Sequence, residues 1–246
     1  MTVIEYTTTQ NLSSTINLAS DGLLRGVGSK QIIINSTANP IISVASNLSD
    51  LVKTALIENV IIFGNGTNTA ILLQNVFNCQ IRNVSIVNCD TGVKLTSTGS
   101  GWSQSNHIQH VRMSYVNKGV QFAPGGTNNF GFTHIEDVNI SLNNSQNLNG
   151  IEIGTGCKPY SSFIKANVWS SQQCNGIYCD GEIKYCLINF NHEKTTSGAA
   201  GCGVYLGSNA VIGSSINQSF FVAAGNLGSA VCNPYSKAND IVYKTY

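Results

Sequence analysis

The chain has 246 residues, with 13 Lys or Arg against 12 Asp or Glu and a formal net charge of +1, so it lacks the excess positive charge with which proteins bind a nucleic-acid backbone. Only 10% of its residues are charged, compared with about 25% in typical soluble domains. No stretch approaches the 18 apolar residues of a membrane span, and residues 1–10 lack the basic and apolar regions of a secretory signal.

Neutral polar side chains must therefore keep the surface hydrated. A coat of Asn, Ser, Thr and Gly depends little on pH or salt, which favours a virion or extracellular surface. The lack of a signal favours a particle assembled inside a cell. Eight glycosylation sequons are compatible with this location: Asn11, Asn35, Asn47, Asn65, Asn83, Asn139, Asn143 and Asn217.

The first 44 residues are predicted to form a less regular opening coil. Residues 23–28 (LLRGVG) and the apolar run at 32–34 are expected to be two of its strands. Regular coils follow over residues 45–246. No linker separates a second domain, so we expect a single domain over residues 1–246.

A first motif, apolar-x-x-apolar-x-apolar, recurs from residue 57 onward. Its first members are 24, 27, 27, 48 and 28 residues apart, and the step of 48 hides one coil, for which residues 163–169 are the irregular candidate. Side chains on a strand alternate with period two, so the gap of three predicts a bend, with Asn59 or Asn83 in left-handed backbone there. The members are Ile57/Val60/Ile62, Ile81/Val84/Ile86, Ile108/Val111/Met113, Ile135/Val138/Ile140, Ile183/Cys186/Ile188 and Val211/Ser214/Ile216.

A second motif, Gly-[Val/Ile]-x-apolar, alternates with the first. Its Val or Ile residues are 27, 31, 26 and 27 residues apart, and its glycine is expected to permit the turn into a strand. Residues 70–73 and 230–233 extend the series at both ends. The members begin at Gly92, Gly119, Gly150, Gly176 and Gly203.

The two motifs together predict an all-β fold, a single-stranded right-handed parallel β-helix. Such a solenoid has seven or eight coils of roughly 27 residues and three short strands per coil, with equivalent strands about 4.8 Å apart. Propeller blades need about 40 residues, leucine-rich repeats need helical returns, and left-handed helices use hexapeptides, so these repeats fit less well.

The alternation of Asn-Val-x-Ile with Gly-[Val/Ile]-x-apolar, together with LRGVG and a following Ile in residues 24–34, resembles the pectate-lyase-like β-helix superfamily over nearly the whole chain. This superfamily includes polysaccharide lyases, polygalacturonase-type hydrolases and phage tailspikes. The resemblance implies that the second-motif strands form the floor of a glycan groove. Its outward positions would be Lys94, Gln121, Glu152, Tyr178 and Tyr205.

The motifs of the hydrolases are matched only in part. Polygalacturonase-type enzymes carry an Asn-Thr-Asp-Gly stretch and an Asp-Asp pair near that floor. Residues 88–92 (NCDTG) and 149–153 (NGIEI) approach the first, and the chain has no Asp-Asp. The resemblance therefore specifies an architecture more firmly than an activity.

Glu152 and Asp180 are a candidate pair of catalytic carboxyls. They lie one coil apart with an offset of two residues, so a diagonal of about 7–8 Å is expected. This lies within the roughly 6.5–9.5 Å of inverting glycosidases. The alternative is coincidence, since 12 carboxylates on a stacked surface easily produce such a spacing.

A histidine cluster is a second candidate. The 27-residue step stacks His107 on His134 and His110 on Asp137, all pointing outward. These side chains could hold a metal ion or perform acid–base chemistry. Alternatively they form a polar ladder, in which His110 and Asp137 occupy the bend that asparagines hold in the preceding coils.

Aromatic side chains could bind a neutral sugar. Tyr178 and Tyr205 lie on adjacent coils beside Glu152, and Trp102 lies in the loop at residues 97–106. Sugar chains pack on aromatic faces and hydrogen-bond to amides. The tyrosine pair could instead simply cover the sheet.

The chain has eight cysteines and no C-x-x-C. Cys186 occupies the second position of the first motif and Cys179 the last position of the second, so both are predicted to be core residues. Cys174 and Cys202 lie near the same turn on neighbouring coils and could form a bridge.

These observations favour a structural and glycan-binding β-helix of a virion or cell surface, such as a tail-spike or tail-fibre subunit. Its partners would be a cell-surface polysaccharide and other virion proteins, no cofactor is expected, and the tailspike resemblance implies a homotrimer. One alternative is a polysaccharide lyase or glycoside hydrolase that uses Glu152 with Asp180, or the histidine cluster. Another is a purely architectural spike that binds no sugar.

Overall fold

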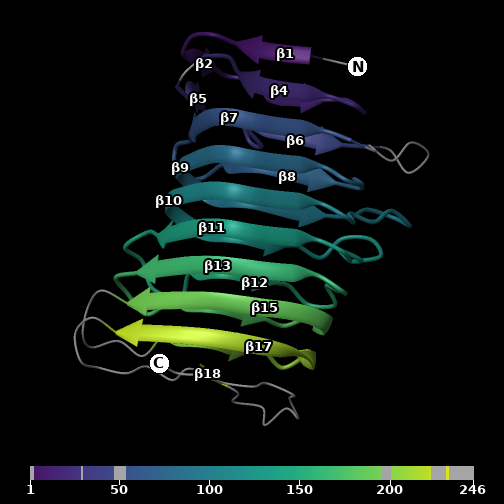
Figure 1. The fold of residues 1–246 in the computed structure, drawn as a ribbon, viewed down its shortest axis with the longest axis vertical. Helices are drawn as coiled ribbons and strands as arrows, with labels where there is room; N and C mark the ends of the chain where they lie inside the picture. Colours follow the sequence, from purple (N-terminus) through teal and green to yellow (C-terminus); the bar gives the residue numbers. More distant parts are fainter. Residues whose placement is uncertain (1–2, 29, 47–53, 195–200, 223–230, 233–246) are drawn as a thin grey trace.

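The computed structural model describes residues 3–28, 30–46, 54–194, 201–222 and 231–232. Over these residues the chain forms strands and no helix, and the strands build a parallel β-solenoid of about seven turns with roughly 27-residue spacing. The turns stack along the long axis of the molecule (Figure 1). The predicted fold class is confirmed. No helix among these residues is long and apolar enough to cross a membrane.

The described strands join into a single set of hydrogen-bonded neighbours. They are β1 (Val3–Tyr6), β2 (Gln10–Leu12), β3 (Ile16–Leu18), β4 (Leu23–Gly26), β5 (Ile32–Ser36), β6 (Ile42–Ala45), β7 (Leu56–Phe63), β8 (Thr69–Gln74), β9 (Gln80–Thr96), β10 (His107–Phe122), β11 (His134–Leu142), β12 (Asn149–Ile153), β13 (Phe163–Ser170), β14 (Asn175–Cys179), β15 (Glu182–Lys194), β16 (Cys202–Leu206), β17 (Val211–Val222) and β18 (Val231–Cys232).

Each turn passes through three parallel sheets. The first sheet contains β1, β4 and the starts of β7, β9, β10 and β11. The second contains β2, β5 and the segments that follow the bend in those strands. The third contains β3, β6, β8, the ends of β9 and β10, and then β12, β14, β16 and β18. Strands β9 and β10 bend so that each runs through all three sheets.

The third sheet has the register that the second motif predicts. Val93 pairs with Val120, which pairs with Ile151, and the predicted extensions at Ile71 and Val231 are also in register. The ladder continues beyond Ile71 to Ile42 and Ile16. Regular pairing therefore reaches into the segment that was expected to be a less regular opening coil.

The register of the later first-motif coils differs from the prediction. β13 is the coil hidden in the 48-residue step, as expected. Ile164 pairs with Ile135 on one side and with Ile188 on the other, so Ile188 takes the first position of the motif, which the sequence assigned to Ile183. The reason is that β13 and β15 both run straight where the earlier coils bend, and the gap of three between Ile183 and Cys186 spans a different bend, at Tyr185 (φ 58°), just before the first sheet.

Cys186 consequently does not lie at the level of Val138. Ala166 pairs with Val138 and with Phe190, so Phe190 occupies that level. Cys186 lies before the motif, yet it is still buried, at 5% exposure. Its predicted burial is confirmed and its predicted position is wrong.

The bend between the first two sheets has left-handed backbone at four successive coils. The φ angles are 58° at Asn59, 53° at Asn83, 52° at His110 and 51° at Asp137. Asn83 Nδ2 donates a hydrogen bond to Asn59 Oδ1 at 3.1 Å. Both the predicted bend and its continuation by His110 and Asp137 are confirmed. We call these four residues the bend ladder.

A second left-handed column, just before the first sheet, was not expected. Its residues include two aromatic side chains, which rarely adopt positive φ. They are Asn78, Ser105, Phe132, Ser161 and Tyr185, with φ between 49° and 60°.

The glycines of the second motif serve close packing rather than a turn. Gly92, Gly119, Gly150 and Gly176 all have negative φ or extended backbone, outside the left-handed region. A Cβ added to any of these four would lie only 2.5–2.7 Å from the carbonyl oxygen of the corresponding glycine in the next coil. The predicted role is therefore corrected: these positions lack a side chain because adjacent coils approach too closely for one.

The core is a single column of Ile, Val and Leu side chains with cysteines among them. Cys179 pairs with Ile153 and is fully buried, as predicted. Burial raises the pKa of Cys79, Cys89, Cys157 and Cys179 to about 12. These residues therefore remain protonated thiols that pack as small hydrophobic groups.

The bridge that the spacing of Cys174 and Cys202 allowed does not form. Cys174 is a thiol whose Sγ donates to the carbonyl oxygen of Ser145 at 3.3 Å. Cys202 is disulfide-bonded, so its partner is not Cys174.

Candidate functional site

The outer face of the third sheet carries the five positions that the sequence assigned to a glycan groove. Each lies directly beside the next on adjacent strands, in the order Lys94, Gln121, Glu152, Tyr178 and Tyr205. The predicted alignment of these five residues in register is confirmed. We call this set the third-sheet column.

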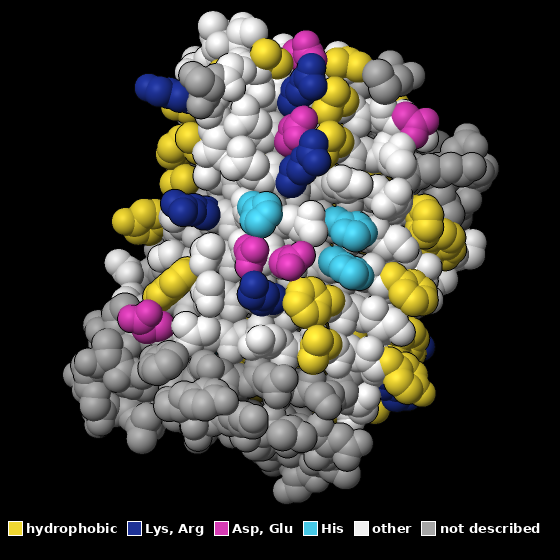
Figure 2. All heavy atoms as spheres, viewed as in Figure 1, with side chains coloured by type: hydrophobic (Ala, Val, Ile, Leu, Met, Phe, Trp, Pro, Cys, Tyr) yellow, Lys and Arg dark blue, Asp and Glu magenta, His cyan; other side chains and the backbone are white. Residues whose placement is uncertain are grey.

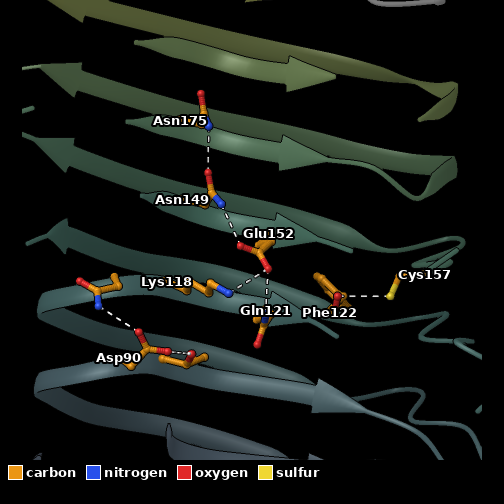
Figure 3. Close-up of polar contacts among 10 residues, drawn as sticks. Asp90, Lys118, Gln121, Phe122, Asn149, Glu152, Cys157 and Asn175 are labelled. Atoms are coloured by element: carbon orange, nitrogen blue, oxygen red, sulfur yellow. Dashed lines mark hydrogen bonds and ion pairs between the residues drawn. The ribbon is translucent and has the colours of Figure 1, made fainter. Parts of the chain in front are cut away.

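Glu152 is the hub of a polar network across this face (Figure 3). Its Oε1 accepts a hydrogen bond from Gln121 Nε2 at 2.8 Å and lies 3.2 Å from Lys118 Nζ. Its Oε2 accepts from Asn149 Nδ2 at 2.8 Å, and Asn149 Oδ1 accepts in turn from Asn175 Nδ2 at 2.9 Å. Both carboxylate oxygens are engaged, so this glutamate ties neighbouring strands together.

Asp180 has a different set of partners. Thr155 Oγ1 donates to its Oδ2 at 2.5 Å, and Asn209 donates from its backbone nitrogen to Oδ1 at 2.9 Å and from Nδ2 to Oδ2 at 3.0 Å. Asp180 is 8% exposed and connects the turn after β14 to the loops after β12 and β16. Glu152 and Asp180 thus each hold a separate part of the solenoid together.

Tyr178 and Tyr205 are stacked, with ring centroids 5.7 Å apart and planes at 17°. Each ring therefore packs one of its faces against the other ring. The pair lines a cavity of about 340 Å³ whose other lining groups are mostly amides and hydroxyls. The lining residues are Asn147, Asn149, Asn175, Tyr178, Asp180, Tyr205, Gly207 and Ser208.

Trp102 is not brought to this cavity. Its ring contacts Phe77 edge-on, at a centroid distance of 5.6 Å and an angle of 87°. Both residues lie in loops that enter the first sheet, whereas the tyrosines lie within the third. The tertiary structure therefore does not support the predicted grouping of Trp102 with the two tyrosines.

The histidine cluster divides into two pairs, which lie on the face shown in Figure 2. His107 and His134 stack in the first sheet, with centroids 4.8 Å apart and planes at 27°. His110 Nδ1 lies 3.6 Å from Asp137 Oδ2 in the bend ladder. The stacking that the 27-residue step predicted is confirmed for both pairs.

The surroundings of these pairs shift two pKa values. Burial, and then the charge of His134, lower the pKa of His107, so this imidazole is a weaker base than usual. A hydrogen bond from Lys165 Nζ to Asp137 Oδ1, at 2.8 Å, lowers the pKa of Asp137. Within the described residues, no group of three or more His, Cys, Asp or Glu side chains is placed to hold a metal ion.

Sequence reasoning missed a second polar cavity, of about 390 Å³, beside the bend ladder on the second sheet. The sequence feature that could have indicated this cavity is Arg112, a charged residue that pairs in register with the neutral residues Ser85 and Asn139. The lining residues are Gln31, Asn83, Val84, Ser85, His110, Arg112, Asp137 and Asn139.

Comparisons of the chain with protein-family models, with curated proteins and with solved structures found no match.

Proposed function

We propose that this protein is a structural, glycan-binding β-helix of a virion or cell surface, comparable to a tail-spike or tail-fibre subunit. We further propose that it belongs among pectate-lyase-like β-helices, on the resemblance of its two alternating motifs. The observation that carries the proposal is the cavity at Tyr178 and Tyr205, which combines two phenols with asparagine amides in a space of about 340 Å³.

The chemistry of this cavity suits a neutral or weakly charged sugar chain. Sugar hydroxyl groups both donate and accept hydrogen bonds, as do amides and phenols. Binding sites for small ligands have volumes of roughly 300–1,000 Å³, so one or two sugar residues fit the space. The rigid stack of coils would hold the side chains in place before the ligand arrives, which limits the entropy lost on binding.

The hydrogen bonding of the carboxylates supports binding over catalysis. A general acid or base must reach the glycosidic oxygen or a water molecule. The oxygens of Glu152 already accept hydrogen bonds from Gln121 and Asn149, and those of Asp180 from Thr155 and Asn209. One observation favours the enzymatic alternative: Asp180 lines the same cavity as the two tyrosines.

Binding to a panel of acidic and neutral polysaccharides tests the proposal. The wild-type chain should be retained by at least one glycan, and the Tyr178→Ala/Tyr205→Ala variant should bind that glycan at least about tenfold more weakly. Tyr185→Asn is the matched control, because Tyr185 is 80% exposed outside the cavity and asparagine tolerates its φ of 58°.

The other functional classes predict different results in the same experiment. A purely architectural spike predicts no retention on any glycan, which would overturn the proposal. New reducing ends or unsaturated products would instead assign a hydrolase or a lyase. Light scattering after size-exclusion chromatography checks the proposed homotrimer, for which the tailspike resemblance is the support.

A further inference from the structure

Arg112 differs from the other two arginines of the chain. Arg25 is ion-paired with Glu5, and Arg82 Nε lies 2.7 Å from Glu58 Oε2, so each neutralises a glutamate in a neighbouring coil. Among the residues that the structure describes, the Arg112 guanidinium has neither an ion pair nor a hydrogen bond. It lines the cavity of about 390 Å³ on the second sheet, which we call the Arg112 groove.

Among the described residues, the one carboxylate that lines this groove is already paired with a cation, Lys165. Asp137 Oδ1 accepts from Lys165 Nζ at 2.8 Å, and its Oδ2 lies 3.6 Å from His110 Nδ1. Glu136, the nearest other acid in sequence, precedes the bend, and its Oε2 accepts from Gln109 Nε2 at 3.2 Å. The charge of Arg112 therefore remains in surplus within the groove.

One further donor, from Asn139, lines the same space. Asn139 Oδ1 accepts from Asn167 Nδ2 at 2.9 Å, which leaves the Nδ2 group of Asn139 for a ligand. A guanidinium beside an amide N–H donor matches an oxyanion, because its planar fork binds two oxygens at once.

One end of the groove is closed by a residue from two coils away. Gln31, in the connection between β4 and β5, donates from Nε2 to the carbonyl oxygen of Asn83 at 2.7 Å and accepts at Oε1 from Ser85 Oγ at 3.2 Å. These contacts fix the amide over the second sheet. The groove is thus built from several different coils rather than from one exposed arginine.

We propose that the Arg112 groove binds an oxyanion, namely the carboxylate or sulfate group of an acidic saccharide. This site lies on the second sheet and is separate from the cavity at Tyr178 and Tyr205, so it goes beyond the proposed function and can hold or fail independently of it. A volume of about 390 Å³ accommodates a sugar residue in addition to its charged group.

Calorimetric titration with glucuronate, inorganic sulfate and glucose, at fixed ionic strength, tests the assignment. Glucuronate is expected to bind saturably and glucose is not, because the guanidinium recognises the charge. Sulfate that binds while glucuronate does not would assign the groove to a sulfate group. Absence of binding by both anions would overturn the proposal.

Variants locate the binding. Arg112→Ala should weaken anion binding about tenfold or more, since a charge-assisted hydrogen bond is lost. His110→Asn should change anion binding less than this and still fold, because asparagine holds the same bend at positions 59 and 83. Arg82→Gln, which removes an ion-paired arginine of the first sheet, should leave binding unchanged. Equal affinity for wild type and Arg112→Ala would place the anion elsewhere and refute the site.

Discussion

At Glu182 one carboxylate holds a loop against the solenoid. Tyr160 Oη donates to Glu182 Oε2 at 3.0 Å, and Lys184 Nζ is ion-paired with Oε1. These contacts lower the pKa of Glu182, and the hydrogen bond from Lys184 is the largest cause. The ionised form is therefore favoured in the folded state over the unfolded state.

The stabilisation by Glu182 should depend on pH. Because the folded-state pKa is lowered, the contribution is fully present above the ordinary value of 4.5 and is lost as the pH falls through the folded-state pKa. Glu182→Gln should lower the free energy of unfolding at pH 7 by about 0.5 kcal/mol, as for an exposed ion pair. Urea denaturation at pH 7 and pH 3 should show this difference shrinking at the lower pH. A difference that is equal or larger at pH 3 would contradict the assignment.

At the scale of strands, the glycine column limits how closely the coils of the third sheet approach. Gly150 begins the second-motif segment of β12, and a Cβ there would lie 2.5 Å from Val168 Cγ2 and 2.7 Å from the carbonyl oxygen of Gly176. The carbonyl belongs to the parallel ladder and cannot move aside without breaking the pairing of β12 with β14. The same contact recurs from coil to coil, so the spacing of the whole sheet depends on it.

Gly150→Ala should therefore lower the free energy of unfolding by about 2–3 kcal/mol, the usual cost of overpacking. Gly213→Ala is the control, because Gly213 also lies in a strand but a Cβ there meets only Lys184 Cγ, at 3.3 Å, in a flexible side chain. The control should change stability by less than about 1 kcal/mol. Urea denaturation measures both, and similar values for the two variants would show that the close approach does not limit the packing.

At the scale of the molecule, each coil pairs its strands with those of the coils directly before and after it, and the coils stack in a row (Figure 1). His107 and His134 occupy the same position in successive coils, and Ile108 pairs with Ile135. Stability in such a solenoid is approximately the sum of coil and interface contributions. The length of the stack should therefore be adjustable in units of one complete coil.

Deletion of residues 108–134 removes one coil and joins His107 to Ile135 in the existing register. We expect a folded chain with a β-type circular dichroism spectrum and a smaller denaturant m-value, since less surface is buried. Deletion of residues 108–121 removes about half a coil and should abolish cooperative unfolding, because the inward side chains of every later coil lose their partners. Cooperative unfolding of the half-coil variant would refute the stacked register.

The sequence alone determined the solenoid, the bend ladder and the third-sheet column, because all three follow from one periodicity that the side chains repeat in every coil. It could not place Ile188 or Cys186, since β13 and β15 omit the bend residue, and the gap of three at Ile183 and Cys186 spans the left-handed Tyr185 before the first sheet. Nor could it show why the motif positions are glycine. The reason is a carbonyl oxygen of the next coil that lies too close for a side chain, and this contact forms only in the folded chain.

The tertiary structure also decided which polar residues form a site. Spacing predicted that Glu152 and Asp180 form a pair, but different partners, Asn149 for one and Asn209 for the other, engage their oxygens separately. The Arg112 groove depends on Gln31 reaching over from two coils away, and on Lys165 neutralising Asp137. Periodicity fixes which residues stack within a column, whereas the contacts between columns and loops depend on side-chain reach, which only the folded chain defines.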